Sequence, residues 1–346
     1  MKKFILLCLI AATPLSALTL DKTYKKDGSL NVSVIGNIQA HHYENQDDSV
    51  NLHELELSFQ SYIQKDIRAD IILAVHEAEG GKLETEEAYF TFFNPVSSIL
   101  GIENTPLNKV KAKVGQKFYS FGKHNPLHPE QWDTIDKPLA FSTILGEENA
   151  RGNGGEASVN LPLPFFSELT VGVWDPAAHD HEEEEEEHDE FELAPHVLSA
   201  RLWNSFAISE KSELEVGFST LQGDEDAEGH TSAVTGLDVT YTHKLGAFNR
   251  LKLQGEWLTT TGEYERDGGY LLGSYRASKW WEFGTRYDVL GEFEEEEEKT
   301  LLSVYVTKQL TEVSKLKLQY TGGEEDDTVI SAQIIFGVGP HSHVLQ

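Results

Sequence analysis

Alternation of apolar and polar residues, repeated along most of the chain, constrains the fold more than any other feature of this sequence. Leu251, Leu253 and Trp257, for example, alternate with Lys252 and Glu256. Successive side chains of a β-strand point to opposite faces, so each such segment has one apolar and one polar face. The sequence therefore predicts an all-β protein built from many two-faced strands.

Sixteen segments follow this pattern. They lie near residues 29–41, 51–63, 68–77, 84–93, 109–118, 155–162, 167–174, 195–206, 211–222, 233–244, 249–260, 267–277, 280–290, 300–309, 314–322 and 328–338. Most are longer than strands of soluble proteins, which have about 5–6 residues, and approach the about 9–11 residues that cross a bilayer at a tilt. Single-chain bacterial barrels have an even strand number. We therefore predict a transmembrane antiparallel up-and-down β-barrel of about 16 strands, with 14 and 18 as alternatives.

The connections between these segments fall into two alternating kinds. Short connections carry lysine, at Lys65, Lys211, Lys244, Lys279 and Lys315. The connections between them are longer and strongly acidic, and the richest in acidic residues spans 175–194. Outer-membrane barrels have short periplasmic turns at one end and longer extracellular loops at the other. A soluble β-sandwich is the competing interpretation, but it offers no reason for loops to be sorted in this way.

The N-terminus has the features of an export signal. Lys2 and Lys3 precede an apolar run that is too short to span a bilayer, which takes about 20 apolar residues. We predict a signal peptide at 1–17 and a barrel domain at 18–346, with an N-terminal anchor helix as the alternative. The expected location is the outer membrane of a Gram-negative bacterium, in contact with lipid and lipopolysaccharide.

Charge, cysteine content and motifs exclude several functions. The formal net charge of -30 would repel a phosphate backbone, so no nucleic-acid partner is expected. Cys8 is the only cysteine and lies within the predicted signal, which excludes disulfides and thiol catalysis in the exported chain. The sequence has no G-x-S-x-G, H-E-x-x-H or P-loop motif, and we predict that the protein is not an enzyme.

The polar faces of the strands predict a charged lumen. If the apolar faces contact lipid, the opposite faces line the interior, and they carry charges of both signs. The predicted pore-lining residues are Glu54, Glu56, Lys111, Lys113, Arg201, Glu256, Glu282, Arg286 and Lys317. Buried unpaired charges cost several kcal/mol each, so these faces fit a water-filled channel better than a dry core. A barrel closed by salt bridges and inward loops, without conduction, is the alternative.

One connection, residues 119–154, is much longer than the others. Loops longer than about 12–15 residues in a compact fold are usually functional or disordered, and the aromatic residues of this one argue against disorder. Rings of charged side chains can select ions in a channel. The predicted constriction residues are Lys123, His124, His128, Glu130, Asp133, Asp136, Glu147, Glu148 and Arg151. An ordinary external loop is the competing interpretation.

Several segments resemble porins. The stretch Lys113-Val114-Gly115-Gln116-Lys117-Phe118, followed by Phe121-Gly122-Lys123, resembles a stretch of porins of the phosphate-selective type, and residues 86–90 resemble their acidic-aromatic strand. The sequence departs from that pattern because no proline precedes Phe121-Gly122 and no dense arginine ladder is visible. The resemblance implies a third long loop that folds into the lumen, and a homotrimer.

A second resemblance concerns metals. His124, His128 and the segments 138–139, 146–148 and 339–343 resemble a set of porin-like outer-membrane proteins, some of which are labelled zinc-regulated receptors. Independently, His179, His181 and His188 lie in an acidic tract whose imidazole and carboxylate groups could bind zinc or, through oxygen alone, calcium. No fixed ligand spacing is visible, so a solvated charged loop is the competing interpretation and no resident cofactor is predicted.

These features together predict a porin-like channel for passive diffusion of small hydrophilic solutes or ions. Acidic loops concentrate cations at the mouth, although this effect is screened beyond about 8 Å in physiological salt, so a cation preference is expected rather than phosphate transport. The alternatives are uptake or surface capture of a divalent metal such as zinc through the His/Glu-rich loop, and a structural surface barrel without a pore.

Overall fold

The computed structural model describes most of the chain beyond the N-terminal segment. The described residues are 30–45, 47–76, 81–102, 109–177, 196–225, 231–262, 265–291, 298–311, 313–323 and 328–339. The predicted signal peptide at 1–17 lies outside these residues.

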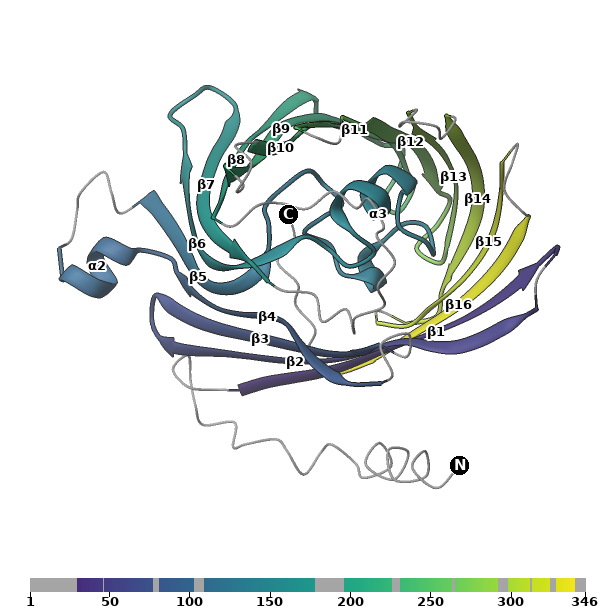
Figure 1. The fold of residues 1–346 in the computed structure, drawn as a ribbon, viewed down its shortest axis with the longest axis horizontal. Helices are drawn as coiled ribbons and strands as arrows, with labels where there is room; N and C mark the ends of the chain where they lie inside the picture. The colour runs from purple at the N-terminus through teal and green to yellow at the C-terminus, as the bar shows by residue number, and fades with distance from the viewer. Residues whose placement is uncertain are drawn as a thin grey trace.

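Sixteen strands in the described residues close into one antiparallel barrel (Figure 1). The strands are β1 (Leu30–Tyr43), β2 (Ser49–Gln64), β3 (Ile67–His76), β4 (Leu83–Phe92), β5 (Val110–Phe118), β6 (Arg151–Asn160), β7 (Phe166–Pro176), β8 (Val197–Ser209), β9 (Ser212–Glu225), β10 (Thr231–Lys244), β11 (Arg250–Thr261), β12 (Asp267–Arg276), β13 (Trp281–Leu290), β14 (Lys299–Gln309), β15 (Lys315–Gly323) and β16 (Val329–Val338). Each strand pairs with its sequence neighbours, and β1 pairs with β16 to close the barrel. The predicted fold class and strand number are confirmed.

Within the described ranges, three short helices lie in the connections: α2 (Pro95–Leu100), the 3-10 helix η3 (Pro129–Gln131) and α3 (Leu139–Leu145). The α2 helix lies between β4 and β5, so this connection is an exception to the predicted short turns at that end of the barrel. Its first turn is capped by Asn94, whose Oδ1 accepts from the Ser97 amide at 3.2 Å. In the described part of the chain, no helix has the length and apolar character needed to cross a membrane.

The outer surface carries the apolar faces of the strands. In β14, Leu302 and Val304 are 46% and 50% exposed, whereas Ser303 and Tyr305 are buried. Aromatic residues gather at the ends of strands that lead into the short turns, as membrane-interface girdles do. They are Tyr62, Phe93, Phe166, Phe248, Trp280 and Trp281. This surface suits contact with lipid, because soluble monomers rarely expose such large apolar patches.

The long connection between β5 and β6 folds inside the barrel, where α3 lies beside β11, β12 and β13 (Figure 1). We call residues 119–150 the inner loop. Asn125 closes its base: the side chain donates to the Tyr119 and Ala150 carbonyls, both at 3.0 Å, and accepts from the Ala150 amide at 2.9 Å. The loop is shorter than predicted because β6 begins at Arg151, so Arg151 is a strand residue.

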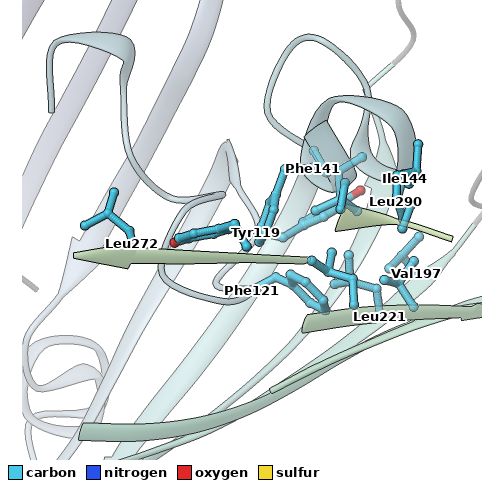
Figure 2. Packing of buried hydrophobic residues seen from close by; sticks show 14 of the residues in the cluster. Tyr119, Phe121, Phe141, Ile144, Val197, Leu221, Leu272 and Leu290 are labelled. Carbon is cyan, nitrogen blue, oxygen red and sulfur yellow. The ribbon is translucent and has the colours of Figure 1, made fainter. Parts of the chain in front are cut away.

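An apolar patch on the inner wall holds the inner loop. Phe121, Phe141 and Ile144 of the loop pack against buried side chains of the wall (Figure 2). The wall residues of this cluster are Trp174, Val197, Leu221, Val234, Leu258, Tyr270, Leu272, Leu290 and Tyr305. In this part of the barrel apolar side chains point inward as well as outward, which strict alternation along the strands did not predict.

Candidate pore constriction

Backbone amides at the start of the inner loop bind polar side chains of the wall. The Gly122 amide donates to Ser219 Oγ of β9 at 3.0 Å, and the Lys123 amide donates to Glu256 Oε2 of β11 at 2.6 Å. Gly122 has a φ of +59°, which favours glycine, and a Cβ there would lie 2.4 Å from Glu256 Oε2 and displace this carboxylate. The Lys123 ammonium pairs with Glu215 of β9. Lys123 is thus held against the wall.

Arg286 of β13 binds the middle of the loop. It is 1% exposed, and its Nε donates to Asp288 Oδ2 at 2.7 Å. Its Nη2 donates to Asp136 Oδ2 at 3.0 Å, and its Nη1 donates to the backbone oxygen of the same residue at 2.9 Å. Gln319 of β15 adds a contact, because its Oε1 accepts from the Ile135 amide at 2.7 Å. These bonds fix Asp136 at a defined place in the lumen.

Asp133 and Thr134 bind two lysines from different strands. Lys252 of β11 lies 2.6 Å from Asp133 Oδ2, and Lys317 of β15 donates to the Thr134 carbonyl at 2.9 Å. Burial alone would raise the pKa of Asp133, but Lys252, Lys317 and Lys315 together hold it below its ordinary value. The carboxylate is therefore charged and paired.

Two basic residues of the loop lie in its own interior. The His124 ring packs between Trp132 and Phe141, with centroids 5.0 and 5.3 Å away, and burial holds its pKa well below the ordinary value. Lys137 donates to the carbonyls of Gly146 and Glu148 at 2.7 and 2.9 Å, and burial lowers its pKa to about 7. Both residues stabilise the loop rather than face open solvent.

The remaining predicted constriction residues divide into exposed and buried groups. The Asp136 side chain is 40% exposed, Glu147 is exposed and Glu148 is partly exposed. Glu130 is buried, and Arg151 on β6 pairs with Glu148 at 2.7 Å. The inner loop therefore has exposed or partly exposed acidic groups, whereas its basic groups are paired or buried.

His128 contacts the opposite wall, among three carboxylates. Its Nε2 lies 3.2 Å from Glu87 Oε2, and its Nδ1 lies 3.3 Å from Glu86 Oε2 and 3.5 Å from Glu56 Oε2. Burial would lower the pKa of His128, but the hydrogen bonds to Glu86 and Glu87 and the charge of Glu56 raise it well above its ordinary value.

Strict alternation could not predict that both Glu86 and Glu87 face inward, because consecutive strand residues normally face opposite sides. Beside this contact, a polar cavity of ≈ 50 Å³ separates the loop from the wall of β2 to β5. Its lining includes Arg68, Asp70, Lys113 and Lys117.

The predicted pore-lining residues lie on the inner face, and most are buried. Glu54, Glu56, Arg201, Glu256, Glu282, Arg286 and Lys317 are buried, whereas Lys111 and Lys113 are half-buried. The Arg201 guanidinium donates two hydrogen bonds to the Asp238 carboxylate, at 2.7 and 3.1 Å. Part of the charge on the lumen wall is therefore paired. The predicted metal ligands His179, His181 and His188 lie outside the described residues.

No protein-family model matches the chain. An uncharacterised protein of Aquifex aeolicus is 24% identical over 220 residues, which are 53% of this chain and 45% of that protein, so the match spans less than half of the relative's length.

Solved structures of outer-membrane proteins match almost the whole chain. The channel DcaP of Acinetobacter baumannii has a TM-score of 0.58 at 12% identity and covers 91% of this chain and 98% of its own. OprB of Pseudomonas putida has a TM-score of 0.60 at 10% identity, with 90% and 94% covered. OmpT of Vibrio cholerae in its trimer form has a TM-score of 0.58 at 9% identity, with 90% and 100% covered. The chain therefore has the sixteen-stranded barrel fold of outer-membrane porins.

Proposed function

We propose that this protein is an outer-membrane channel for passive diffusion of ions and small hydrophilic solutes. The observation that carries the proposal is the inner loop, whose charged side chains are fixed inside a closed sixteen-stranded barrel. Barrels of 16–18 strands leave an aqueous channel, unlike the smallest barrels, whose interior side chains can fill. A loop held across such a lumen narrows it and brings charges close to any permeating ion.

The proposed channel prefers cations. Asp133, Asp136, Glu147 and Glu148 are exposed or partly exposed acidic groups of the inner loop, whereas its basic residues His124, His128 and Lys137 are buried and Lys123 pairs with Glu215. The chain as a whole has a formal net charge of -30. Fixed negative charge attracts cations and repels anions, most strongly where the passage is narrow.

The proposed passage is narrow. Most of the predicted pore-lining side chains are buried, and the polar cavity beside His128 measures ≈ 50 Å³. A space of this size holds a few water molecules. Hydrated small ions therefore fit the proposal better than large solutes.

The proposed partners are outer-membrane lipid and lipopolysaccharide around the apolar belt, and two further copies of the chain in a homotrimer. The exposed apolar faces of the strands support the lipid contact. The trimer is proposed from the resemblance to porins, among which OmpT of Vibrio cholerae has been solved in a trimer form.

A structural surface barrel without a pore is the second candidate. The apolar packing of α3 on β11, β12 and β13, together with the burial of the lumen charges, favours it over a wide channel. Such a barrel would not raise the permeability of a membrane to salt, which separates the two candidates.

Reversal potentials test the proposed cation preference. The refolded protein is placed in a planar bilayer with a gradient of potassium chloride. We expect a cation-selective potential that moves toward zero in Asp136→Asn, which removes the most exposed charge that Arg286 fixes in the lumen. Asp48→Asn is the matched control, since Asp48 lies outside the lumen in the β1–β2 connection and should leave the potential almost unchanged. An anion-selective potential in the wild type would contradict the proposed selectivity.

A further inference from the structure

Four buried ionisable side chains meet where the inner loop contacts β2 and β4. Glu54 and Glu56 come from β2, Glu86 comes from β4 and His128 comes from the loop. One oxygen or ring nitrogen of each residue lies within 4.8 Å of those of the other three. Three carboxylates and one imidazole thus converge on one point inside the barrel, and we call these four residues the carboxylate–histidine cluster.

A β-bulge in β4 turns Glu86 toward this point. Glu87 lies opposite Ile72 and Thr85 lies opposite Leu73, so Glu86 is an extra residue in the pairing of β3 with β4. Bulges re-aim side chains and are common beside functional sites. Because of this bulge, Glu86 and Glu87 are both buried on the inner face, although they are consecutive in a strand.

The neighbouring strands complete the space around the carboxylate–histidine cluster. The pairing of β1 with β2 shifts between Asn37 and Ile38, which leaves His53 as an extra residue directly before Glu54. On β3, which runs between the two carboxylate-bearing strands, Ala74 is fully buried. Its small side chain leaves room for the carboxylates from both sides to approach one another.

The Glu54 carboxylate is the observation that points to a ligand. Glu54 is 2% exposed, and among the described residues neither of its carboxylate oxygens has a hydrogen-bond partner. Buried charges in proteins are paired or coordinate metals, because an isolated carboxylate is strongly disfavoured away from water. A cation at the centre of the carboxylate–histidine cluster would provide the missing partner.

His128 is held in an orientation that suits a metal ligand. Its Nε2 lies 3.2 Å from Glu87 Oε2 and can donate to that oxygen, so Nδ1, which faces the carboxylates of the cluster, could bind a metal once it has released its own proton. Glu87 is fixed in turn, since its Oε1 accepts from the Phe118 amide at 3.1 Å. Histidines that bind metals almost always donate their other N–H to a carboxylate, a carbonyl or water in this way.

We propose that Glu54, Glu56, Glu86 and His128 bind one divalent transition-metal ion, with Zn²⁺ as the best match, and that this ion fastens the inner loop to the wall. Zinc takes four nitrogen or oxygen ligands at about 2.0–2.2 Å, which places ligand atoms about 3.3 Å apart. The distances from His128 Nδ1 to the Glu86 and Glu56 oxygens, 3.3 and 3.5 Å, are close to that spacing. Calcium fits poorly because it takes six to eight oxygen ligands.

Equilibrium zinc binding tests this site directly. The full chain, refolded and stripped with a chelator, is titrated with Zn²⁺ against a coloured competitor. We expect Glu54→Gln to lose one tight equivalent or to weaken it at least tenfold. Glu168→Gln is the matched control. Glu168 pairs with Lys111 at a distance of 3.7 Å and does not belong to the carboxylate–histidine cluster, so this variant should bind zinc like the wild type. Residues 179–190 are present in all three proteins, so their binding cancels in the comparison.

Two further measurements distinguish loss of the metal site from a folding defect, and neither requires the protein to conduct ions. We expect Zn²⁺ to raise the midpoint of thermal unfolding of the wild type but not of Glu54→Gln, and Ca²⁺ to raise neither, because a ligand stabilises the state that binds it. Co²⁺ bound to the wild type should show the spectrum of a four-coordinate site with one nitrogen ligand. Three outcomes would each overturn the proposal. They are equal zinc binding by the wild type and Glu54→Gln, no zinc binding by the folded wild type, and a Co²⁺ spectrum of a six-coordinate site with oxygen ligands only. None of these readouts depends on conduction.

Discussion

Single residues in this barrel show that a charge in the lumen is not the same as a charge available to a permeating ion. Arg286 and Arg201 are buried, and each binds aspartate, at 2.7 Å to Asp288 and at 2.7 and 3.1 Å to Asp238. Removing one partner of a buried pair leaves the other charge uncompensated, at a cost of about 3–5 kcal/mol. Such pairs therefore fix the inner loop and the wall. Asp136 is also bound to Arg286, but its side chain is 40% exposed, so it stays within reach of ions.

Lys137 gives the loop a pH-dependent stability. Its pKa in the folded protein is about 7, whereas a lysine in an unfolded chain has a pKa of about 10.4. Between these values the unfolded chain binds more protons, so this residue makes stability rise as the pH rises from about 7 to about 10. We expect the thermal midpoint of the wild type, relative to that of Lys137→Met, to increase over this range.

The geometry around Lys137 agrees with the sign of this effect. A neutral amine has two N–H groups, and the two carbonyls of Gly146 and Glu148 accept from Nζ at 2.7 and 2.9 Å. The methionine variant lacks these bonds at every pH, so their loss adds a constant offset only. A difference between the two thermal midpoints that stays constant from a pH of about 7 to about 10 would contradict this prediction and show that Lys137 is charged in the folded state.

At the level of elements, all sixteen strands were predictable because each has one face toward lipid and one toward the interior. The largest error in a boundary is the start of β6, predicted at 155 and found at Arg151. Gly152 and Gly154 carry no side chains, so alternation is invisible there. The long connection at α2 was also missed, since no periodic pattern distinguishes a short helix in a turn.

The contacts of the inner loop were less predictable, because they depend on residues from many strands. One signal was present in the sequence: adjacent apolar residues near the ends of strands, such as Trp257-Leu258 and Val289-Leu290, where one residue faces lipid and the other packs on the loop. Both Leu258 and Leu290 belong to the apolar patch. The inward pair Glu86 and Glu87 had no such signal, because a bulge cannot be seen in strict alternation.

Shortening the inner loop tests its role as the constriction. Replacing residues 129–146 with a short Gly-Ser linker removes η3 and α3 but keeps Asn125 and Ala150 at the base. We expect conductance to rise several-fold, because the segment that fills the lumen is gone. Deleting residues 182–187 from the β7–β8 connection is the control and should leave conductance nearly unchanged. Equal conductance of the shortened and native proteins would place the constriction elsewhere.

For the whole molecule, the closed barrel accounts for a chain that is strongly acidic yet exposes many large apolar side chains. Closure removes the edge strands, so every strand in the described residues has two hydrogen-bonded neighbours, as a membrane requires of a β-protein. The charges then lie in the lumen and in the connections. Pore size was not predictable from the sequence, because it depends on how deeply the inner loop packs into the barrel.

Single-channel current through the refolded protein in a planar bilayer is the most direct test of the central claim that the inner loop narrows an open channel. We predict a small, stable conductance in potassium chloride, because the lumen is narrowed by the loop but lined by polar and charged groups. No current from protein whose electrophoretic mobility shows a folded barrel would contradict this account, and would show that the loop and its paired charges close the lumen completely.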